Sequence, residues 1–406
     1  MGTQQDRFFS TLVNAGMPKI PDEFSVVPLH QEIPKAILAE IDVFIDVFDR
    51  VTTRPAWQEA VTANSSEFLR QKRSEACFFS AWDLHLPPGE PENWQLIEFN
   101  DNGSGFLFAG LINRAFYEIF DLAQKEAIEA PPEWSLFTEH IAGMVETEAR
   151  AFFGRRPSEL LLILDDAESL QRGKFNQELL LLRDLLQRRG WKAEIASPPG
   201  VSWDGQHLYW QGRKVDFIVN RSTDFLWQAE HFAALRAAYR AREVYVAPNP
   251  FTYATRSDKR LLEFLSLPDW DHELCIRPRE RAILEAHVPT TYLIREENLE
   301  DIASHKEEFF FKPTQSFASR GALTSSQVGR SRLRRLLRKR QAYVAQRRAS
   351  KSLLKPAENG DVELWTDLRI WAYRGQRFLL SGRASRLPDL LDLRPPGGWL
   401  PSYARS

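Results

Sequence analysis

The sequence contains 406 residues, of which 43% are hydrophobic and 27% charged, and its formal net charge is -2. This length exceeds what one hydrophobic core usually supports, so two or three subdomains are expected, and the composition excludes a largely disordered chain. The small net charge gives no global reason to expect nucleic acid as the main partner, and two distant cysteines, Cys77 and Cys275, offer neither a disulfide framework nor a CxxC metal site.

The sequence also lacks the signals of membrane insertion and secretion. No apolar run approaches the length of a membrane span, and the first residues lack the apolar stretch of a signal peptide. A soluble, cytoplasmic protein that acts on small molecules and has no membrane partner is therefore expected.

The first part of the chain, residues 1–75, has a mostly helical pattern and is expected to form a helical N-terminal region. Between residues 33 and 51, apolar residues such as Ile37, Ile41 and Phe48 recur at helical spacing. Two short apolar runs follow at 76–82 and 94–99, and the proline-rich stretch between them predicts two strands joined by a loop.

A different pattern begins near residue 159. A buried strand at 160–164, a helix at 175–189 and a strand at 191–196 are followed by a hairpin at Asp204-Gly205, a strand at 215–219, a helix at 229–242 and a strand at 244–247. Such alternation of strands and helices predicts a parallel α/β unit.

The last part of the chain mixes short helices and strands. A short helix carries Asp258 and Lys259, and a strand at 308–313 runs into a loop of small residues. Further strands are expected at 342–346, 368–373 and 377–381, and no internal repeat is present.

The first candidate for chemistry is the pair Glu98 and Asn100. Because the side chains of a strand alternate, a separation of two places both on one face, and Asp83 at the end of the neighbouring strand could supply a third oxygen. Carboxylate and amide oxygens suit Mg²⁺, which takes its remaining ligands from water and substrate phosphates. The alternative is an exposed loop in which Asn, Asp and Gly only form turns.

The second candidate is Lys312, which stands near a strand end before a hydroxyl-rich loop at 313–322. Such a loop can bring backbone N–H groups to phosphates while the ammonium neutralises their charge. A surface loop with a lysine at its base is the alternative. No Walker motif G-x-x-x-x-G-K-[ST] occurs, and Gly103-x-Gly105 lacks the spacing of a dinucleotide fingerprint.

The third candidate is the basic run at 330–340. Its leucines, Leu333, Leu336 and Leu337, recur at helical spacing, so a solvated amphipathic helix is the favoured interpretation, and contact with an anionic substrate or RNA is the alternative.

The fourth candidate is a set of arginines near predicted strand ends, each of which could instead form a surface ion pair. These arginines are Arg221, Arg369, Arg383 and Arg386. Neither H-E-x-x-H nor G-x-S-x-G is present, so zinc-protease and serine-hydrolase functions have no motif to support them.

Taken in order, these segments resemble the circularly permuted ATP-grasp proteins, and they are similar to carboxylate–amine ligases of the glutathionylspermidine synthase type. The resemblance extends from about residue 76 to the C-terminus and is carried by residues 82–86, 96–100, 219–225, 247–250, 257–260, 310–313, 343–346, 367–369 and 381–383. It implies an α/β and α+β architecture, with a circularly permuted ATP-grasp fold and a Rossmann-like pre-ATP-grasp domain. The implied divisions are a permuted segment with metal ligands at 76–150, the pre-ATP-grasp domain at 151–250 and nucleotide-binding subdomains at 251–406.

The resemblance also implies roles for individual residues. Asp83, Glu98 and Asn100 would hold Mg²⁺; Lys259 and Lys312 would contact ATP phosphates; Gln346 would hold the adenine edge; Ser316, Ser319 and Gly321 would belong to a phosphate-binding flap; and Arg369 and Arg383 would stabilise developing charge. Two departures stand out: Ala318 occupies a flap position where relatives commonly have glycine, and the segment 391–398 lacks the usual asparagine.

The implied function is ATP-dependent ligation of a carboxylate to an amine through an acyl phosphate, with ATP and Mg²⁺ as cofactors. Because such phosphoryl transfer needs positioning and charge neutralisation, the lack of a nucleophile motif does not argue against it. The alternatives are a phosphotransferase of the same fold and a non-catalytic nucleotide- or RNA-binding protein that uses the basic helix at 330–340.

Overall fold

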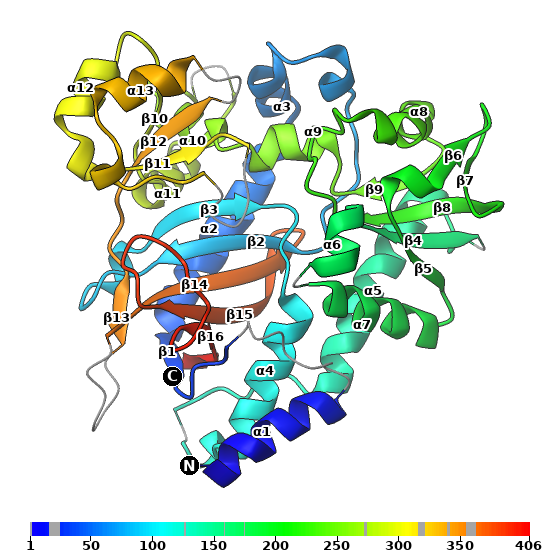
Figure 1. Cartoon of the computed structure of the whole chain (residues 1–406), viewed down its shortest axis with the longest axis horizontal. Helices are drawn as coiled ribbons and strands as arrows, with labels where there is room; N and C mark the ends of the chain where they lie inside the picture. Colours follow the sequence, from blue (N-terminus) through cyan, green and yellow to red (C-terminus); the bar gives the residue numbers. More distant parts are fainter. Residues whose placement is uncertain are drawn as a thin grey trace.

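The computed structural model describes residues 2–15, 25–125, 127–157, 159–173, 175–271, 274–315, 321–338, 342–354 and 363–406. Its strands form three main sheets and one small parallel pair. Figure 1 shows the parallel-stranded part on one side of the molecule, a small antiparallel sheet on the other side and a larger antiparallel sheet between them.

The central antiparallel sheet has six strands, in the order β16-β15-β14-β2-β3 with β13 beside β14. Its strands come from two distant parts of the chain: β2 (Ser80–His85), β3 (Gln95–Asn100), β13 (Ser352–Leu354), β14 (Leu364–Tyr373), β15 (Gln376–Ser385) and β16 (Gly398–Leu400). The two predicted strands at 76–82 and 94–99 are therefore present and pair with each other, with small shifts in their ends.

Helix α2 (Lys35–Thr52) covers one face of this sheet, and in Figure 1 it runs behind β2 and β3. Its apolar stripe includes Ile41, Phe44 and Phe48, which pack against Trp82 and Leu368 of the sheet. The predicted helix is confirmed, but it begins two residues later because Gln31–Pro34 forms β1, which pairs in parallel with β17 (Ser402–Arg405).

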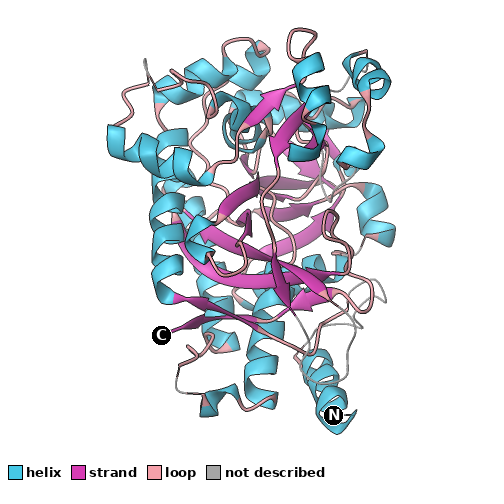
Figure 2. Cartoon of the chain, turned by 90° about the vertical axis from the view of Figure 1, so that its left-hand side faces the viewer, coloured by secondary structure: helices cyan, strands magenta, loops and turns pink. Residues whose placement is uncertain are grey.

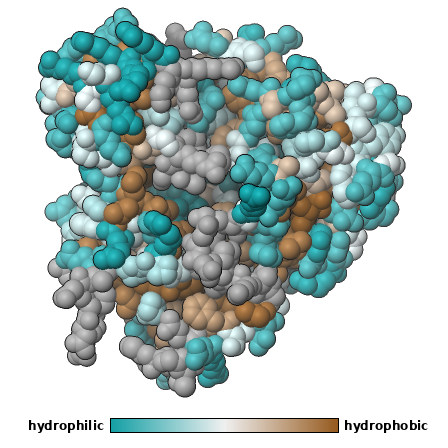
Figure 3. Space-filling model, in the orientation of Figure 1, coloured by the Kyte–Doolittle hydropathy of each residue, from teal (hydrophilic) through white to brown (hydrophobic). Residues whose placement is uncertain are grey.

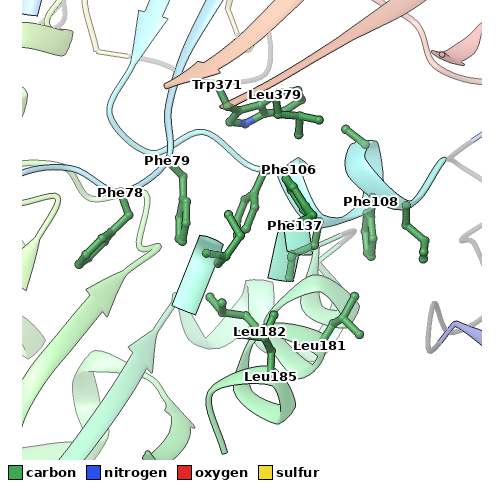
Figure 4. Packing of buried hydrophobic residues seen from close by; sticks show 14 of the residues in the cluster. Phe78, Phe79, Phe106, Phe108, Phe137, Leu181, Leu182, Leu185, Trp371 and Leu379 are labelled. Atoms are coloured by element: carbon green, nitrogen blue, oxygen red, sulfur yellow. The ribbon is translucent and has the colours of Figure 1, made fainter. Parts of the chain in front are cut away.

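Four further α-helices precede the α/β unit in the described part of the chain: α1 (Gly2–Asn14), α3 (Pro55–Thr62), α4 (Phe106–Ile119) and α5 (Trp134–Phe153). A large apolar cluster joins α4 and α5 to the central sheet and to the parallel unit. Figure 4 shows it with Phe79 and Phe106 between Trp371 above and the leucines of α7 below. The N-terminal part and the α/β unit thus share one core.

The α/β unit is confirmed as parallel in its centre. Strands β4 (Leu160–Leu164), β5 (Lys192–Ala196), β8 (Arg213–Asn220) and β9 (Tyr245–Ala247) pair in parallel, whereas the hairpin strands β6 (Val201–Trp203) and β7 (Leu208–Trp210) are antiparallel. Its helices are α6 (Ala167–Arg172), α7 (Asn176–Arg188) and α8 (Ala233–Ala241).

A smaller antiparallel sheet has the order β10-β12-β11. It consists of β10 (Thr291–Leu293), β11 (Phe309–Pro313) and β12 (Tyr343–Arg347), with its own core against α12 (Leu299–Ser304) and α13 (Arg330–Leu337). The short helices α9 (Pro250–Thr252), α10 (Arg260–Phe264) and α11 (Pro278–His287) precede it. Figure 2 shows the strands running through the middle of the molecule with helices around them.

None of the helices in the described part of the chain combines the length and the apolarity needed to cross a membrane.

Candidate active site

One face of the central sheet is charged although the other is apolar. Strand alternation turns Trp82, Leu84 and Leu368 toward α2, so the intervening residues Asp83 and Arg369 project from the opposite face. The register places Asp83 directly opposite Glu98 on β3 and directly opposite Arg369 on β14. Opposite pairs on one sheet face lie close enough to interact, so the three side chains form a row across three strands.

Asp83 is held by two arginines. Arg369 donates to both carboxylate oxygens, with Nε 2.5 Å from Oδ1 and Nη2 2.6 Å from Oδ2, and Arg383 Nη2 lies 3.0 Å from Oδ2. Burial raises the pKa of Asp83, but the two guanidinium groups outweigh it and hold the pKa below its ordinary value. Asp83 is therefore a carboxylate at neutral pH.

Arg383 also binds Asp367, which lies directly opposite it on β14. The pair is bidentate, with Nε 3.0 Å from Oδ1 and Nη2 2.7 Å from Oδ2. Burial lowers the pKa of Arg383, but Asp367 and Asp83 outweigh it and the pKa lies above its ordinary value. Arg383 thus remains a buried, charged group between two carboxylates.

Glu98 faces a lysine from another segment. Lys259, which precedes α10, places Nζ 3.1 Å from Glu98 Oε1, and both side chains are largely buried. Burial raises the pKa of Glu98, but Lys259 and Lys312 outweigh it and lower the pKa. The contact of Oε1 with Lys259 is an ion pair, and Oε1 has no other partner among the described residues.

Lys312 reaches the same place from β11 of the small sheet. Its Nζ donates to the carbonyl oxygen of Ile97 at 3.0 Å and to Oε1 of Gln346 at 2.7 Å. Ile97 is the extra residue of a bulge in β3, because Asp83 pairs with Glu98 whereas Leu84 pairs with Leu96. A bulge leaves backbone groups outside the ladder, so this carbonyl is available to a side chain.

Burial lowers the pKa of Lys312 to about 8, although Glu98 acts in the opposite direction. Gln346 lies on β12, diagonally across from Lys312, so the two long side chains can meet. Its Nε2 is buried and has no hydrogen-bond partner among the residues that the structure describes. An unsatisfied buried donor next to a lysine is a feature that a polar ligand could satisfy.

The residues predicted for Mg²⁺ can be compared with what such an ion needs. Glu98 offers a buried oxygen without a hydrogen bond, and Asn100 lies two residues further along the same strand. Both oxygens of Asp83 are occupied by arginines, and no group of three Asp, Glu, His or Cys side chains suited to a metal occurs in the described ranges. Glu98 and Asn100 fit an ion that takes its other ligands from phosphates. Asp83 could bind such an ion only if an arginine released one of its carboxylate oxygens.

Of the four flap positions Ser316, Ala318, Ser319 and Gly321, only Gly321 belongs to the described part of the chain. Ser316, Ala318 and Ser319 lie outside the described residues. Gly321 follows the gap with φ +74°, and its carbonyl accepts a hydrogen bond of 3.2 Å from the hydroxyl of Tyr343. A β-carbon at this position would be 3.0 Å from the ring of Pro313, so both the conformation and the space favour glycine.

The arginine set divides in two. Arg369 and Arg383 belong to the charged face, whereas Arg221 follows β8 and binds the carbonyl of Gly103 and the hydroxyl of Ser104. Arg386 is exposed beyond the end of β15. A functional role for Arg221 and Arg386 stays a prediction.

The basic run forms α13 in its described part, with Leu333 and Leu336 buried. Arg330 and Arg334 lie 3.2 and 2.9 Å from the carboxylate of Glu300 on α12. Figure 3 shows hydrophilic residues over this corner of the molecule. The amphipathic surface helix is thus confirmed; binding of nucleic acid stays untested.

Two residues of the charged face were missed in the sequence. Asp367 precedes Arg369 by two positions, so strand alternation alone could have placed it on the same face. Lys351 is buried and electrostatically coupled to Asp367 and Arg383, and burial lowers its pKa. It lies in a connection before β13, where no periodic pattern marks a position as buried.

The sequence matches no protein-family model, and no match was found among curated proteins. Among solved structures, the chain is similar to a glutathione synthetase-like effector, GSS30, from Globodera pallida, determined in its apo form, with a TM-score of 0.63, 11% identity and coverage of 99% of this chain and 96% of that one. A putative γ-glutamylcysteine synthetase from Methylobacillus flagellatus gives a TM-score of 0.49 at 12% identity, covering 90% and 86%. The ATP-grasp ligase PsnB, solved with a minimal precursor, gives 0.31 at 10% identity, covering 59% and 88%.

These likenesses concern the fold. The match to the effector spans nearly the whole of both chains, whereas the other two are too weak to carry an argument. The predicted mixed α and β architecture is supported at this coarse level, and the ATP-grasp assignment stays a prediction. The permuted order of segments, the Rossmann-like domain and the domain boundaries stay predictions. The chain thus shares its fold with a glutathione synthetase-like protein.

Proposed function

We propose that the chain is an ATP-dependent ligase that joins a carboxylate to an amine, using Mg²⁺ and an acyl-phosphate intermediate. One observation carries the proposal: Lys259 and Lys312, which come from different parts of the chain, converge on Glu98 in a buried place. Burying two lysines against one carboxylate is costly unless their charge has a further use. Binding a polyphosphate is such a use, because it needs several cations at close range.

In the proposed mechanism, Glu98 and the two lysines change their interaction partners when the nucleotide binds. In this proposal Glu98 and Asn100 hold Mg²⁺, and Lys259 and Lys312 then neutralise phosphate in place of Glu98. The unpartnered Nε2 of Gln346 supplies a donor on the nucleotide side. Mg²⁺ contributes neutralisation of phosphate charge and alignment of the phosphates.

The proposed reaction has two steps. A carboxylate oxygen of the substrate attacks the γ-phosphorus, the bond to the β-γ bridging oxygen breaks, and ADP leaves. The amine nitrogen then attacks the acyl carbon, inorganic phosphate leaves, and the nitrogen loses a proton. Negative charge builds up in both steps, and Arg369 and Arg383 are the buried cations assigned to stabilise it.

The fold is consistent with this chemistry. The effector that matches nearly the whole chain is described as glutathione synthetase-like. Because one fold can serve many functions, the proposal rests on the site and takes only general support from the fold.

The test is calorimetric titration of a non-hydrolysable ATP analogue, with and without Mg²⁺. Wild type should bind saturably and more tightly with Mg²⁺. Lys312→Ala should weaken binding roughly tenfold to a hundredfold, since a hydrogen bond to a charged group contributes about 1.5–3 kcal/mol. Glu98→Ala should remove most of the gain from Mg²⁺.

Lys192→Ala is the matched control, because Lys192 is an exposed lysine at the start of β5. It should bind the analogue as wild type does. If folded wild type binds no analogue, or if Lys312→Ala and Lys192→Ala bind equally well, the proposed nucleotide site is wrong.

A further inference from the structure

A second candidate site lies between α2 and α11, away from the charged face. The two helices border a cavity of about 280 Å³ that is partly open to solvent. Both helices pack on the apolar face of the central sheet, α2 through Phe44 and α11 through Leu284. The sheet therefore separates this cavity from the candidate active site.

Part of the cavity lining is apolar. Val43 and Val47 lie four residues apart on α2, so both face the same side of the helix. Val47 is almost fully buried, whereas Val43 is 46% exposed. Ile283 of α11 faces them across the cavity and packs against the core below. A hydrocarbon group in the cavity would cover these side chains and remove apolar surface from water, which favours binding.

The charged part of the lining is mainly basic, with three arginines and one glutamate. The carboxylate of this glutamate, Glu280, is already paired. Arg54 donates to both of its oxygens, at 2.7 and 2.8 Å, and the backbone N–H of Arg277 donates to Oε2 at 3.0 Å. Arg50 lies 2.9 Å from Asp46 and 3.6 Å from Glu280. The carboxylate in the lining is thus neutralised, and the cavity remains positively charged.

Two guanidinium groups of the lining remain without a counter-ion. Those of Arg277 and Arg279 donate no hydrogen bond to, and form no ion pair with, any residue that the structure describes. Only Pro278 separates them in sequence, so both can act on one group of a ligand. Guanidinium groups pair with carboxylate or phosphate through two parallel N–H···O bonds. The arginines therefore favour an anionic group.

The volume limits the size of the ligand. A water molecule takes up about 30 Å³ of the liquid, so a cavity of this volume has room for roughly nine non-hydrogen atoms of similar size. That space exceeds what a carboxylate or phosphate group alone needs. The remainder adjoins the apolar part of the lining.

We propose that this cavity binds a small organic anion, with its acidic group on Arg277 and Arg279 and its apolar body on Val43, Val47 and Ile283. An inorganic anion would leave the apolar lining uncovered, and the arginines would repel an organic cation. The proposal does not depend on the ligase function, because the cavity and the charged face lie on opposite faces of the central sheet.

The test compares three probes by calorimetric titration into the full-length protein. Hexanoate matches the cavity in size, hexylammonium has the same chain with the opposite charge, and inorganic phosphate has the charge without the chain. Hexanoate should bind wild type saturably and about tenfold more tightly than either of the other two. Arg277→Ala and Arg279→Ala should each weaken hexanoate binding several-fold. Val43→Asp should weaken it too, because it places a carboxylate beside the apolar body.

Arg188→Ala is the matched control, because Arg188 is an exposed arginine at the end of α7 and does not line the cavity. Lys312→Ala is a second control, since Lys312 acts on the charged face. Both variants should bind hexanoate as wild type does.

Several results would overturn the proposal. These are no saturable binding of hexanoate, equal or tighter binding of hexylammonium or phosphate, and equal hexanoate affinity of Arg279→Ala and Arg188→Ala. Loss of hexanoate binding in Lys312→Ala would also overturn it, because the anion would then bind at the charged face. The nucleotide titrations described above are independent of these outcomes, so either proposal can fail without the other.

Discussion

Burial and neighbouring charges shift the pKa values of individual residues on the charged face. Burial and the positive charge of Lys259 lower the pKa of Lys312, whereas the negative charge of Glu98 raises it. The result is an ammonium that loses its proton near neutral pH more readily than an exposed lysine does. Its charge, and with it any phosphate contact, therefore depends on pH.

The first prediction concerns this pH dependence. With a pKa of about 8 in the free protein, Lys312 is mostly protonated below that pH and mostly neutral above it. Affinity for the ATP analogue should be constant below about pH 7 and should fall by up to about tenfold per pH unit above 8. Calorimetric titrations between pH 6.5 and about 9.5 measure this.

Lys312→Arg is the companion variant. Arginine remains charged throughout this range, so its affinity should not fall in the same way, even if its absolute value is lower. An unchanged affinity of wild type across the whole range would show that the Lys312 proton does not control binding.

At the scale of single elements, the apolar stripe of α2 stabilises the central sheet. Its apolar stripe packs on the face of the central sheet opposite Asp83, so the helix stabilises the strands that carry the site. Phe44 lies in the middle of this contact, fully buried, with its ring edge-on to Trp94 and His287. Aromatic contacts of this kind add to the free energy of burial.

The second prediction is that Phe44→Ala lowers the free energy of unfolding by about 3–5 kcal/mol, the range for removing a buried aromatic ring. Urea denaturation followed by tryptophan fluorescence measures it. Val43→Ala is the control, because Val43 is the preceding residue of the same helix and is 46% exposed; its effect should stay within about 0.5 kcal/mol. Similar losses of unfolding free energy for both variants would show that the apolar stripe of α2 does not stabilise the sheet.

At the scale of the whole molecule, separate parts are joined by buried polar contacts as well as by apolar packing. Glu178 of α7 accepts from the backbone N–H groups of Gly105 and Leu107, at 2.7 and 2.9 Å, and so caps the first turn of α4. Gly105 has φ +88°, and a β-carbon there would lie 2.4 Å from Trp399. This junction links the parallel unit, α4 and the central sheet.

The third prediction is that Glu178→Ala destabilises the protein by about 2–3 kcal/mol, because it leaves two buried N–H groups at a helix N-terminus unpaired. Glu178→Gln keeps an acceptor of nearly the same shape and should recover part of the loss. Glu168→Ala, at an exposed position on α6, is the control for urea denaturation. A loss no larger than that of Glu168→Ala would show that the cap does not contribute.

Periodicity within short segments made several features predictable. The stripe of α2, the alternating strands and helices around β4 and β8, and the shared face of Glu98 and Asn100 depend on residues close in sequence. The same reasoning could have placed Asp367 beside Arg369. The position of Lys312 near a strand end marked it as a candidate, and the resemblance of short motifs added Lys259. No local pattern determines that these two lysines converge.

The sequence by itself determined the local elements and which residues share one face of a strand or helix. Only the tertiary structure decided which elements become neighbours: it places Asp83 against Arg369, 286 positions away, and Lys312 on the carbonyl of Ile97, 215 positions away. It also places Arg221 on the carbonyl of Gly103, 118 positions away, and buries Ser222 and Tyr253. The physical reason is that strand register and packing between distant segments depend on the shape and charge of both partners, and neither segment specifies its partner alone.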